Sequence, residues 1–460
     1  MKFTAYFYQG IVYSLLRKGE KERALNLLKR LRKRGILTCK TYEKYGFLLI
    51  RDGNLDKAEE VLKEGIEKFK KCSGIFRLLK EIYIRKGEID KAIQTIKIAK
   101  ENNPEVYWYD IILGDIYYYE KKDPETALSF YTKLLDRDDV PLTSDIKSPA
   151  RYLFKRLSRI YYKLGDYEKA TCFYKKFYEL KPSNFYENDF FFYGDTLFKL
   201  GKRKEAEEIF KDGIKRRRGN IIKKKVKELG LNLGEPDEAK ERKDAERIPI
   251  KTPLITERTN LIDLIDELTK DKRRKGDIIT VASSVSAISQ GRVYSVETID
   301  VKPLAKILSK FVSRNRNTPF ATTAPLSNPY AMQVAVEEAG VFKILLASFI
   351  GFIGKLLRRR GWFYIIAGKN VAQIDDMPAS MPPYDYYVIP GPENPDNFCE
   401  EIKKKTSCEA CIVDANDLGI AWVVGKSTGV DKSWVEDVMS DNPAGNEDYQ
   451  TPIIILRKKP

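Results

Sequence analysis

The 460-residue sequence contains no histidine, and this absence removes several kinds of catalytic site at once. It excludes a Ser-His-Asp triad, a Cys-His pair and any zinc site with a histidine ligand. Acid–base or metal chemistry in this chain must therefore rest on Asp, Glu, Lys, Tyr, Cys or amide side chains.

Cysteine is scarce as well, with six residues in the chain. That number is too small for a disulfide scaffold in a protein of this length. The close pair Cys408 and Cys411 lacks the second pair that a zinc ribbon needs. The apolar run that begins at Cys411 is typical of a buried strand, so we interpret the pair as core residues rather than a redox or metal site.

Long apolar runs are missing too, since the longest, Ile344–Gly354, is too short to span a bilayer. Tyr6, Tyr8 and Tyr13 interrupt the apolar N-terminal stretch, and no small-residue cleavage site follows it. These features predict a cytoplasmic protein without a signal peptide.

One apolar segment, 341–357, is followed directly by Arg358, Arg359 and Arg360 and has two interpretations. It is an amphipathic helix on a membrane surface, or a core helix with a basic C-terminal end. We favour the core helix and expect no membrane contact.

Charge is unevenly distributed along the chain. Residues 1–250 carry 56 Lys and Arg against 40 Asp and Glu, a net +16, whereas residues 251–460 carry 27 against 26, a net +1. The first half therefore suits an acidic partner or is a soluble Lys-rich helical surface. Its short basic runs lack interleaved aromatic residues, so we expect no nucleic acid. The length predicts two or more domains.

A repeat of 34 residues organises the first half of the chain. Gly19, Gly53 and Gly87 recur at this spacing, each followed five residues later by an alanine. The alanines, including those of later units, are Ala24, Ala58, Ala92, Ala127, Ala170 and Ala206. Glycine permits a tight turn between two antiparallel helices, and the small alanine permits close packing. A large apolar residue follows each alanine by four positions.

This pattern resembles the tetratricopeptide repeat (TPR), a family of helix–turn–helix units that stack into solenoids. We predict an α-helical TPR solenoid at 1–233, with about six repeats and a final capping helix at 211–233. Lys122 replaces the expected glycine in the fourth repeat. The resemblance implies a protein-interaction module.

Cations recur near the end of the first helix of each repeat but the fourth. They are Arg17, Arg51, Arg85, Lys163 and Lys199. The family resemblance implies that this column lies near the concave groove, where it binds an acidic protein or peptide. The alternative is structural, since cations at a helix C-terminus complement the helix dipole.

A charged stretch at 234–248 is predicted to be a linker, and the chain changes character after it. Residues 249–460 alternate short β-branched runs with helical segments, which predicts an α/β domain with a mixed sheet. The expected strands are 278–282, 292–296, 362–367, 386–389, 410–413 and 453–456, and the expected helices are 299–315 and 330–340.

Four stretches of this half carry a second resemblance. They are IPIKTPLIT from 248, GDIITVASSVSAISQGR from 276, GWFYIIAG from 361, and YYVIPGPENPDNFCEEI followed by CIVDANDLG from 386 and 411. In order and spacing they resemble the coenzyme F-420 gamma-glutamyl ligases, which add glutamate to a deazaflavin cofactor. The resemblance covers about 249–460.

The resemblance implies an acid–amino-acid ligase that uses GTP or ATP with Mg²⁺ or Mn²⁺. A carboxylate of a small-molecule acceptor is activated, and the amine of glutamate then attacks it. The implied nucleotide-binding residues are Ser284, Gln290, Gly291 and Arg292, with Arg292 also catalytic. The implied metal ligands are Asp375, Asp414, Asn416 and Asp417.

Two function hypotheses remain open. The first is a metal- and nucleotide-dependent, gamma-glutamyl ligase-like domain tethered to a TPR module. The alternative is a non-catalytic TPR scaffold whose degenerate ligase-like domain only binds metal, nucleotide or a partner. Ser284 and Ile288 replace two lysines of the family's first loop, which favours the alternative.

Overall fold

The computed structural model describes residues 2–17, 20–143, 148–180, 185–216, 219–234, 244–312, 325–357, 362–374, 382–416, 420–444 and 450–459. They divide into two compact units. The first comprises residues 1–153 and 296–300, and the second residues 154–295 and 301–460.

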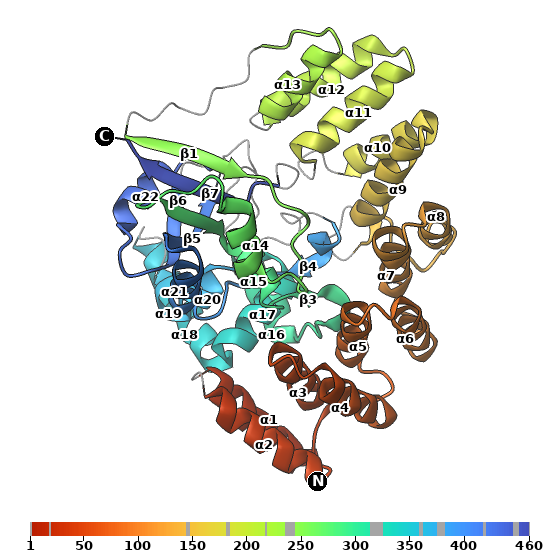
Figure 1. Ribbon diagram of the computed structural model, residues 1–460. Helices are drawn as coiled ribbons and strands as arrows, with labels where there is room; N and C mark the ends of the chain where they lie inside the picture. Colours follow the sequence, from red (N-terminus) through yellow and green to blue (C-terminus); the bar gives the residue numbers. More distant parts are fainter. Residues whose placement is uncertain are drawn as a thin grey trace. The chain divides into compact units, whose positions relative to one another are not determined.

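Antiparallel helix pairs fill the N-terminal half, as the 34-residue repeat predicts (Figure 1). The first unit holds α1 (Lys2–Arg17), α2 (Lys21–Lys33), α3 (Cys39–Arg51), α4 (Leu55–Lys68), α5 (Ser73–Arg85), α6 (Ile89–Asn102), α7 (Trp108–Asp115), the π-helix η1 (Ile116–Lys121) and α8 (Pro124–Lys133). Then follow α9 (Ala150–Leu164), α10 (Tyr167–Leu180), α11 (Glu187–Lys199), α12 (Arg203–Arg216) and α13 (Asn220–Glu228). The capping helix expected at 211–233 is shorter than predicted: residues 211–216 belong to α12, and the last helix begins only after Gly219, which has a φ of 74°.

The repeat residues have the roles that the sequence predicts. Gly53, Gly87, Gly165 and Gly201 each have a φ between 74° and 79°, the left-handed conformation that favours glycine. The alanines of all six repeats are fully buried, and so are the large residues four positions later. The packing is close: a Cβ added at Gly46, Gly114 or Gly194 would collide with Leu62, Tyr131 or Phe210.

A disulfide within the first unit joins Cys39 at the start of α3 to Cys72 just before α5, a separation of 33 residues. This disulfide was not predicted, because cysteines one repeat apart are not close in sequence. Closing a chain segment of this length stabilises a fold by roughly 3–4 kcal/mol. Cys408 and Cys411 are free and buried, as predicted.

A five-stranded mixed sheet is the centre of the α/β part of the second unit, as predicted. Its order is β1-β7-β2-β5-β6, in which β2 and β5 are parallel and the other pairs antiparallel. The strands are β1 (Ala245–Ile250), β2 (Ile278–Ala282), β5 (Glu409–Asn416), β6 (Ile420–Lys426) and β7 (Ile453–Lys458). A separate ribbon pairs β3 (Tyr294–Ser295) with β4 (Tyr387–Val388).

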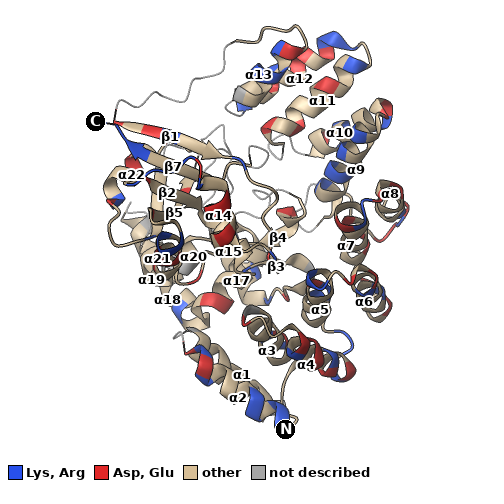
Figure 2. Ribbon diagram, viewed as in Figure 1, with Lys and Arg blue, Asp and Glu red and all other residues tan. Residues whose placement is uncertain are grey.

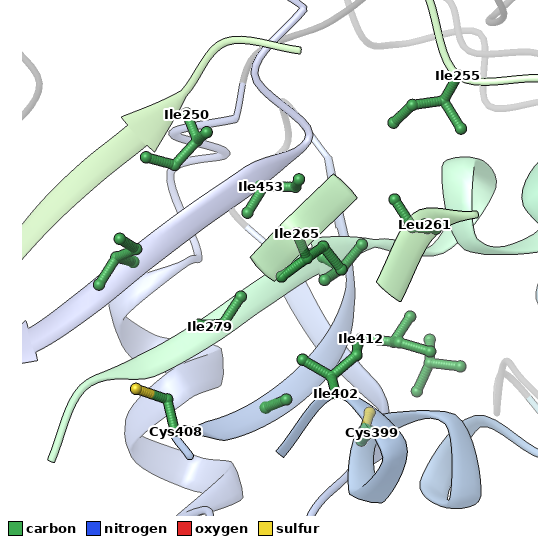
Figure 3. Close-up of a cluster of buried hydrophobic side chains, with 14 residues drawn as sticks. Ile250, Ile255, Leu261, Ile265, Ile279, Cys399, Ile402, Cys408, Ile412 and Ile453 are labelled. Atoms are coloured by element: carbon green, nitrogen blue, oxygen red, sulfur yellow. The ribbon is translucent and has the colours of Figure 1, made fainter. Parts of the chain in front are cut away.

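Each face of the sheet has its own apolar core. Ile279 and Val281 point to one face, where they pack with residues of α14 (Leu261–Thr269) and α21 (Pro395–Thr406), including Ile265 and Ile402 (Figure 3). Ile278 belongs to the other cluster, with residues of α22 (Lys432–Val438). The alternation follows from the two-residue period of a strand.

The remaining helices follow β2 and β3 in sequence. They are α15 (Ser283–Ser289), η3 (Val296–Thr298), α16 (Pro303–Phe311), η4 (Pro325–Ser327), α17 (Pro329–Ala339), α18 (Val341–Leu356), α19 (Trp362–Ala367), α20 (Lys369–Ala372) and η6 (Tyr384–Tyr386). Among the described helices, none has both the length and the apolar character that crossing a bilayer requires.

Several of the expected elements are corrected by the structure. The strand expected at 386–389 is limited to β4, because Tyr386 belongs to η6. Residues 362–367 form the helix α19, although aromatic and β-branched residues favour a strand, because α19 packs along α18. The helix expected at 299–315 begins only at Pro303, whose fixed φ suits a first helical turn. The strand expected at 292–296 is limited to β3. Most of the linker predicted at 234–248 lies outside the described residues, and its end belongs to β1.

Lys122 generates the first prediction. It has a φ of 57° where other repeats have glycine, and a side chain in this conformation costs about 1 kcal/mol. We expect Lys122→Gly to raise the free energy of unfolding by a comparable amount, measured by denaturant titration. Gly87→Lys, the opposite exchange in the third repeat, is the matched control and should destabilise the protein. An unchanged or lower stability of Lys122→Gly would contradict the prediction.

Candidate functional site

The parallel pairing of β2 with β5 brings the C-terminal ends of both strands to one edge of the sheet. Ala282 at the end of β2 lies opposite Val413, so Ser284 in α15 and Asp414 in β5 both follow at this edge. Ligands of open α/β sheets commonly bind outside the carboxyl ends of parallel strands. The pairing thus places two of the predicted site residues at a suitable edge.

Other strand ends meet at the same edge. The backbone N–H of Ala282 donates to Pro452 O, just before β7, over 2.8 Å. The N–H of Thr252, just after β1, donates to Gln450 O, also over 2.8 Å. The edge is therefore built from segments that are far apart in the sequence.

Asp414 is the predicted metal ligand whose side chain the structure describes. It is partly buried, and burial raises its carboxyl pKa. Among the described residues, its carboxylate has no hydrogen-bond or ion-pair partner. A carboxylate in such surroundings is costly unless a cation accompanies it. Asp414 therefore has the chemistry of a hard-cation ligand.

The other predicted metal ligands cannot be placed beside it. Asp375 and Asp417 lie outside the described residues, and Asn416 is described only by its backbone at the end of β5. Among the residues that the structure describes, no group of three or more Cys, Asp and Glu side chains is arranged to hold a metal ion.

The predicted nucleotide-binding loop is held by hydrogen bonds to the segment after β4. The Gln290 side chain accepts from the N–H of Glu393 over 2.7 Å and donates to its carbonyl over 3.1 Å. Gly291 has a φ of 69°, which permits the turn that follows α15. Together these contacts fix the loop against residues 391–393.

Arg292 is partly buried, with 11% of its side chain exposed, and already has protein partners. Its Nε donates to Gly391 O over 2.6 Å, and its Nη2 bonds to a Glu338 carboxylate oxygen over 3.0 Å. Burial opposes the charge, but Glu338 and Tyr294 outweigh it and raise the pKa of Arg292. Among the described residues, two of its five guanidinium donors have partners, and both bonds hold Arg292 against Gly391 and Glu338.

The segment that Arg292 holds is also anchored to helix α9 of the same unit. Arg156 makes two hydrogen bonds, of 3.0 and 2.9 Å, to the two carboxylate oxygens of Asp385 in η6. Both side chains are buried, and the guanidinium lies 5.5 Å from the ring centre of Tyr386. This bidentate, desolvated pair fixes η6, which leads through β4 to Gly391.

The same face of α9 binds a second internal carboxylate. Arg159 lies 2.7 Å and Lys155 3.7 Å from fully buried Asp189. Burial opposes the charge of Asp189, but Lys155 and Arg159 prevail and lower its pKa. The Lys and Arg side chains on this face of α9 thus bind aspartates of the same protein.

The predicted cation column is described in part. Arg85 pairs with Glu81 over 2.8 Å, and Lys199 with Asp195 over 3.0 Å, each one turn earlier in its own helix. Lys163 is exposed, and the side chains of Arg17 and Arg51 lie outside the description. These pairs are compatible both with cations that stabilise the ends of their helices and with cations that line a peptide-binding groove. Partner binding by this column therefore stays a prediction.

Sequence reasoning missed Arg156 and Asp385. Their separation of 229 residues gives no local signal of the pair. One cue existed: the run Leu153–Arg159 places cations inside an otherwise apolar helical pattern. Such cations are buried only when they are paired.

Fold and site together define a helical repeat solenoid followed by an α/β domain with a mixed sheet. The repeats match the tetratricopeptide repeat family at 156–184 and 190–220. The family of the α/β domain is identified as well. Residues 249–414 match the family described as F420-0:Gamma-glutamyl ligase, so the chain carries a domain of this glutamate-adding ligase family. Both resemblances stated from the sequence are confirmed.

Solved structures similar to this chain include three TPR proteins. One from Parabacteroides merdae is 17% identical (50% of this chain, 94% of that chain, TM-score 0.34). One from Cytophaga hutchinsonii is 19% identical (46% and 78%, TM-score 0.36). YrrB, described as a TPR protein with an unusual peptide-binding site, is 15% identical (44% and 97%, TM-score 0.33). No protein of curated function matches the chain significantly.

The Arg156–Asp385 pair generates the second prediction. Asp385→Asn leaves a buried guanidinium without its counter-charge, so we expect a loss of about 3–5 kcal/mol in the free energy of unfolding. Denaturant titration of Asp385→Asn, Arg156→Met and the double variant gives the coupling energy between the two side chains. We expect the double variant to be more stable than the sum of the single losses implies.

An exposed ion pair of the same unit is the matched control. Lys405 and Asp263 lie 2.9 Å apart with both side chains largely exposed. Lys405→Met should leave the unfolding midpoint nearly unchanged. Strictly additive losses at Arg156 and Asp385 would show that the buried pair is not a unit.

Proposed function

We propose that the α/β domain forms an amide bond between glutamate and a carboxylate of a small-molecule acceptor, with consumption of GTP or ATP. The observation that carries the proposal is the family match at 249–414. It is supported by the sheet edge where Ser284 follows β2 and Asp414 lies near the end of the parallel strand β5.

The reaction proceeds in two displacements. An acceptor carboxylate oxygen attacks the terminal phosphorus of the nucleotide, and the nucleoside diphosphate leaves. The amine of glutamate then attacks the acyl carbon, phosphate leaves and the nitrogen loses a proton. Both steps depend on positioning and on compensation of negative charge, which do not need histidine.

The chain's own residues supply this positioning. Gln290 and Arg292 form hydrogen bonds to residues 391–393, so the loop after α15 and the segment after β4 are held against each other. The Ser284 hydroxyl adds a hydrogen-bond donor where β2 ends. We therefore expect the nucleotide and the acceptor to bind beside the loop after α15 and the end of β2.

Mg²⁺ and Mn²⁺ prefer oxygen ligands, and Asp414 offers a carboxylate that burial partly removes from water. Asp375, Asn416 and Asp417 complete the proposed ligand set. When bound, the ion neutralises phosphate charge.

The third prediction tests this site. We expect Mn²⁺ to bind the full-length protein, measured by calorimetry, and Asp414→Asn to weaken binding at least roughly tenfold, since it removes an anionic ligand. Exposed Asp271→Asn, in the turn after α14, is the matched control and should bind normally. Unchanged affinity of Asp414→Asn would remove Asp414 from the site.

The pH dependence gives the same test a second readout. Because burial raises the pKa of Asp414, the fraction of ionised carboxylate falls at a higher pH than for an exposed aspartate. Mn²⁺ affinity should therefore be full above the raised pKa and decline as the pH falls through it. In Asp414→Asn the decline should move to lower pH, where the remaining aspartates of the proposed ligand set become protonated.

A non-catalytic scaffold is the second candidate, and two observations favour it. Ile288, where the resemblance leads us to expect a lysine, is buried, and Arg292 is committed to Glu338 and Gly391. Thermal-shift measurements with GTP or ATP and Mn²⁺ separate the candidates. Stabilisation by nucleotide without glutamate-dependent nucleotide consumption would support the scaffold.

For the solenoid we propose binding of a protein or peptide, with an acidic segment as the ligand. The net +16 of residues 1–250 supports this choice. Lys and Arg, blue in Figure 2, occur on most of the solenoid helices. The cytoplasmic localisation stays a prediction.

A further inference from the structure

The apolar side chains of α18 that are most exposed form one continuous stripe. Phe342 is 83% exposed, Phe349 62%, Phe352 61% and Leu356 68%. At 100° per residue, these positions and Leu345 fall within roughly a third of the helix circumference. The exposure is therefore a property of one helix face rather than of scattered residues.

The opposite face of the same helix is packed. Ile344 and Ala347 are fully buried, and α18 lies along α19 in a helical hairpin. A Cβ on Gly351 would come within 2.9 Å of Phe363, so the two helices are in close contact. The interpretation of 341–357 as a core helix is thus wrong for half of its surface.

Helix α19, which packs on α18, and helix α16, which packs on α17, carry similar residues. Ile307 and Phe311 on α16 are 53% and 77% exposed, and Ile365 on α19 is 74% exposed. On α16 they alternate with exposed Lys306 and Lys310. Exposed apolar residues rimmed by cations are unusual on the surface of a soluble monomer.

The segment that contains α16, α18 and α19 is strongly basic. Residues 301–374 contain eleven Lys and Arg against two Glu, a net +9, whereas the rest of 251–460 has sixteen against twenty-four, a net −8. Between 341 and 374 there are six cations and no acidic residue. In Figure 2 neither α18 nor α19 carries an Asp or Glu.

We propose that α18, with α16 and α19, binds the surface of an anionic membrane, with the phenylalanine stripe of α18 inserted among the lipid headgroups. An amphipathic helix with Phe and Leu on one face and Lys and Arg around it binds in this way. Cations near an anionic bilayer add to the affinity.

Charge argues against a second copy of the chain as the occupant. A two-fold interface would bring the same patch of each copy together, and a net +9 region would face itself. Anionic lipid headgroups instead complement the patch. The proposal does not depend on the ligase reaction, and it gives the chain a location at a membrane without a span.

The experiment is co-sedimentation of the full-length protein with vesicles of phosphatidylcholine alone or mixed with phosphatidylglycerol. We expect binding to the mixed vesicles that decreases as salt is added. Phe349→Ser with Phe352→Ser should reduce partitioning by at least roughly tenfold, because binding scales with inserted apolar area. Lys306→Gln with Lys310→Gln should reduce it by about tenfold on mixed vesicles.

Phe7→Ser on α1 is the matched control, since Phe7 is 60% exposed outside this region. It should bind mixed vesicles like the unaltered protein. All substituted side chains are exposed, so loss of folding is not expected, and circular dichroism checks this.

Failure of the unaltered protein to bind mixed vesicles would overturn the proposal. So would a concentration-dependent dimer, seen by analytical ultracentrifugation, that the double phenylalanine variant dissociates while vesicles have no effect.

Discussion

The parallel pairing of β2 with β5 determines which chemical groups can meet in the α/β domain. Residues 282 and 413 are 131 positions apart, and this pairing places the residues that follow them at one edge. A register shift of one residue would turn Asp414 to the other face of the sheet. Isoleucines of both strands, packed against α14 and α21, prevent such a shift because their alternation must match two separate cores.

The elements that local sequence determines were predicted, and those that depend on distant packing were not. The solenoid was predictable because four of its repeats combine a left-handed glycine, at positions 53, 87, 165 and 201, with a buried alanine five residues later. Helix α19 was not, because Trp362–Ala367 has strand propensity and becomes helical only against α18. Local preference is weak where tertiary contacts decide the outcome.

The candidate site shows the same division. Ser284 and Asp414 were predicted from a family resemblance, and the sheet places them at one edge. The partners of Arg292 were not predictable, since Glu338 and Gly391 lie 46 and 99 residues away. The Arg156–Asp385 pair was missed for the same reason. A charged residue in an apolar helical pattern indicates that a buried partner exists, but not which one.

These buried contacts change how the solenoid and the α/β domain are to be understood. Helix α9 belongs to the repeats, yet its Arg156 holds η6, and η6 continues through β4 to the carbonyl that Arg292 binds. A displacement of α9 would therefore act on the loop that follows α15. Breaking this desolvated ion pair would leave a buried charge without its partner, so the connection is costly to disrupt. The fifth repeat is thus part of the framework of the candidate site, in addition to any partner that the solenoid binds.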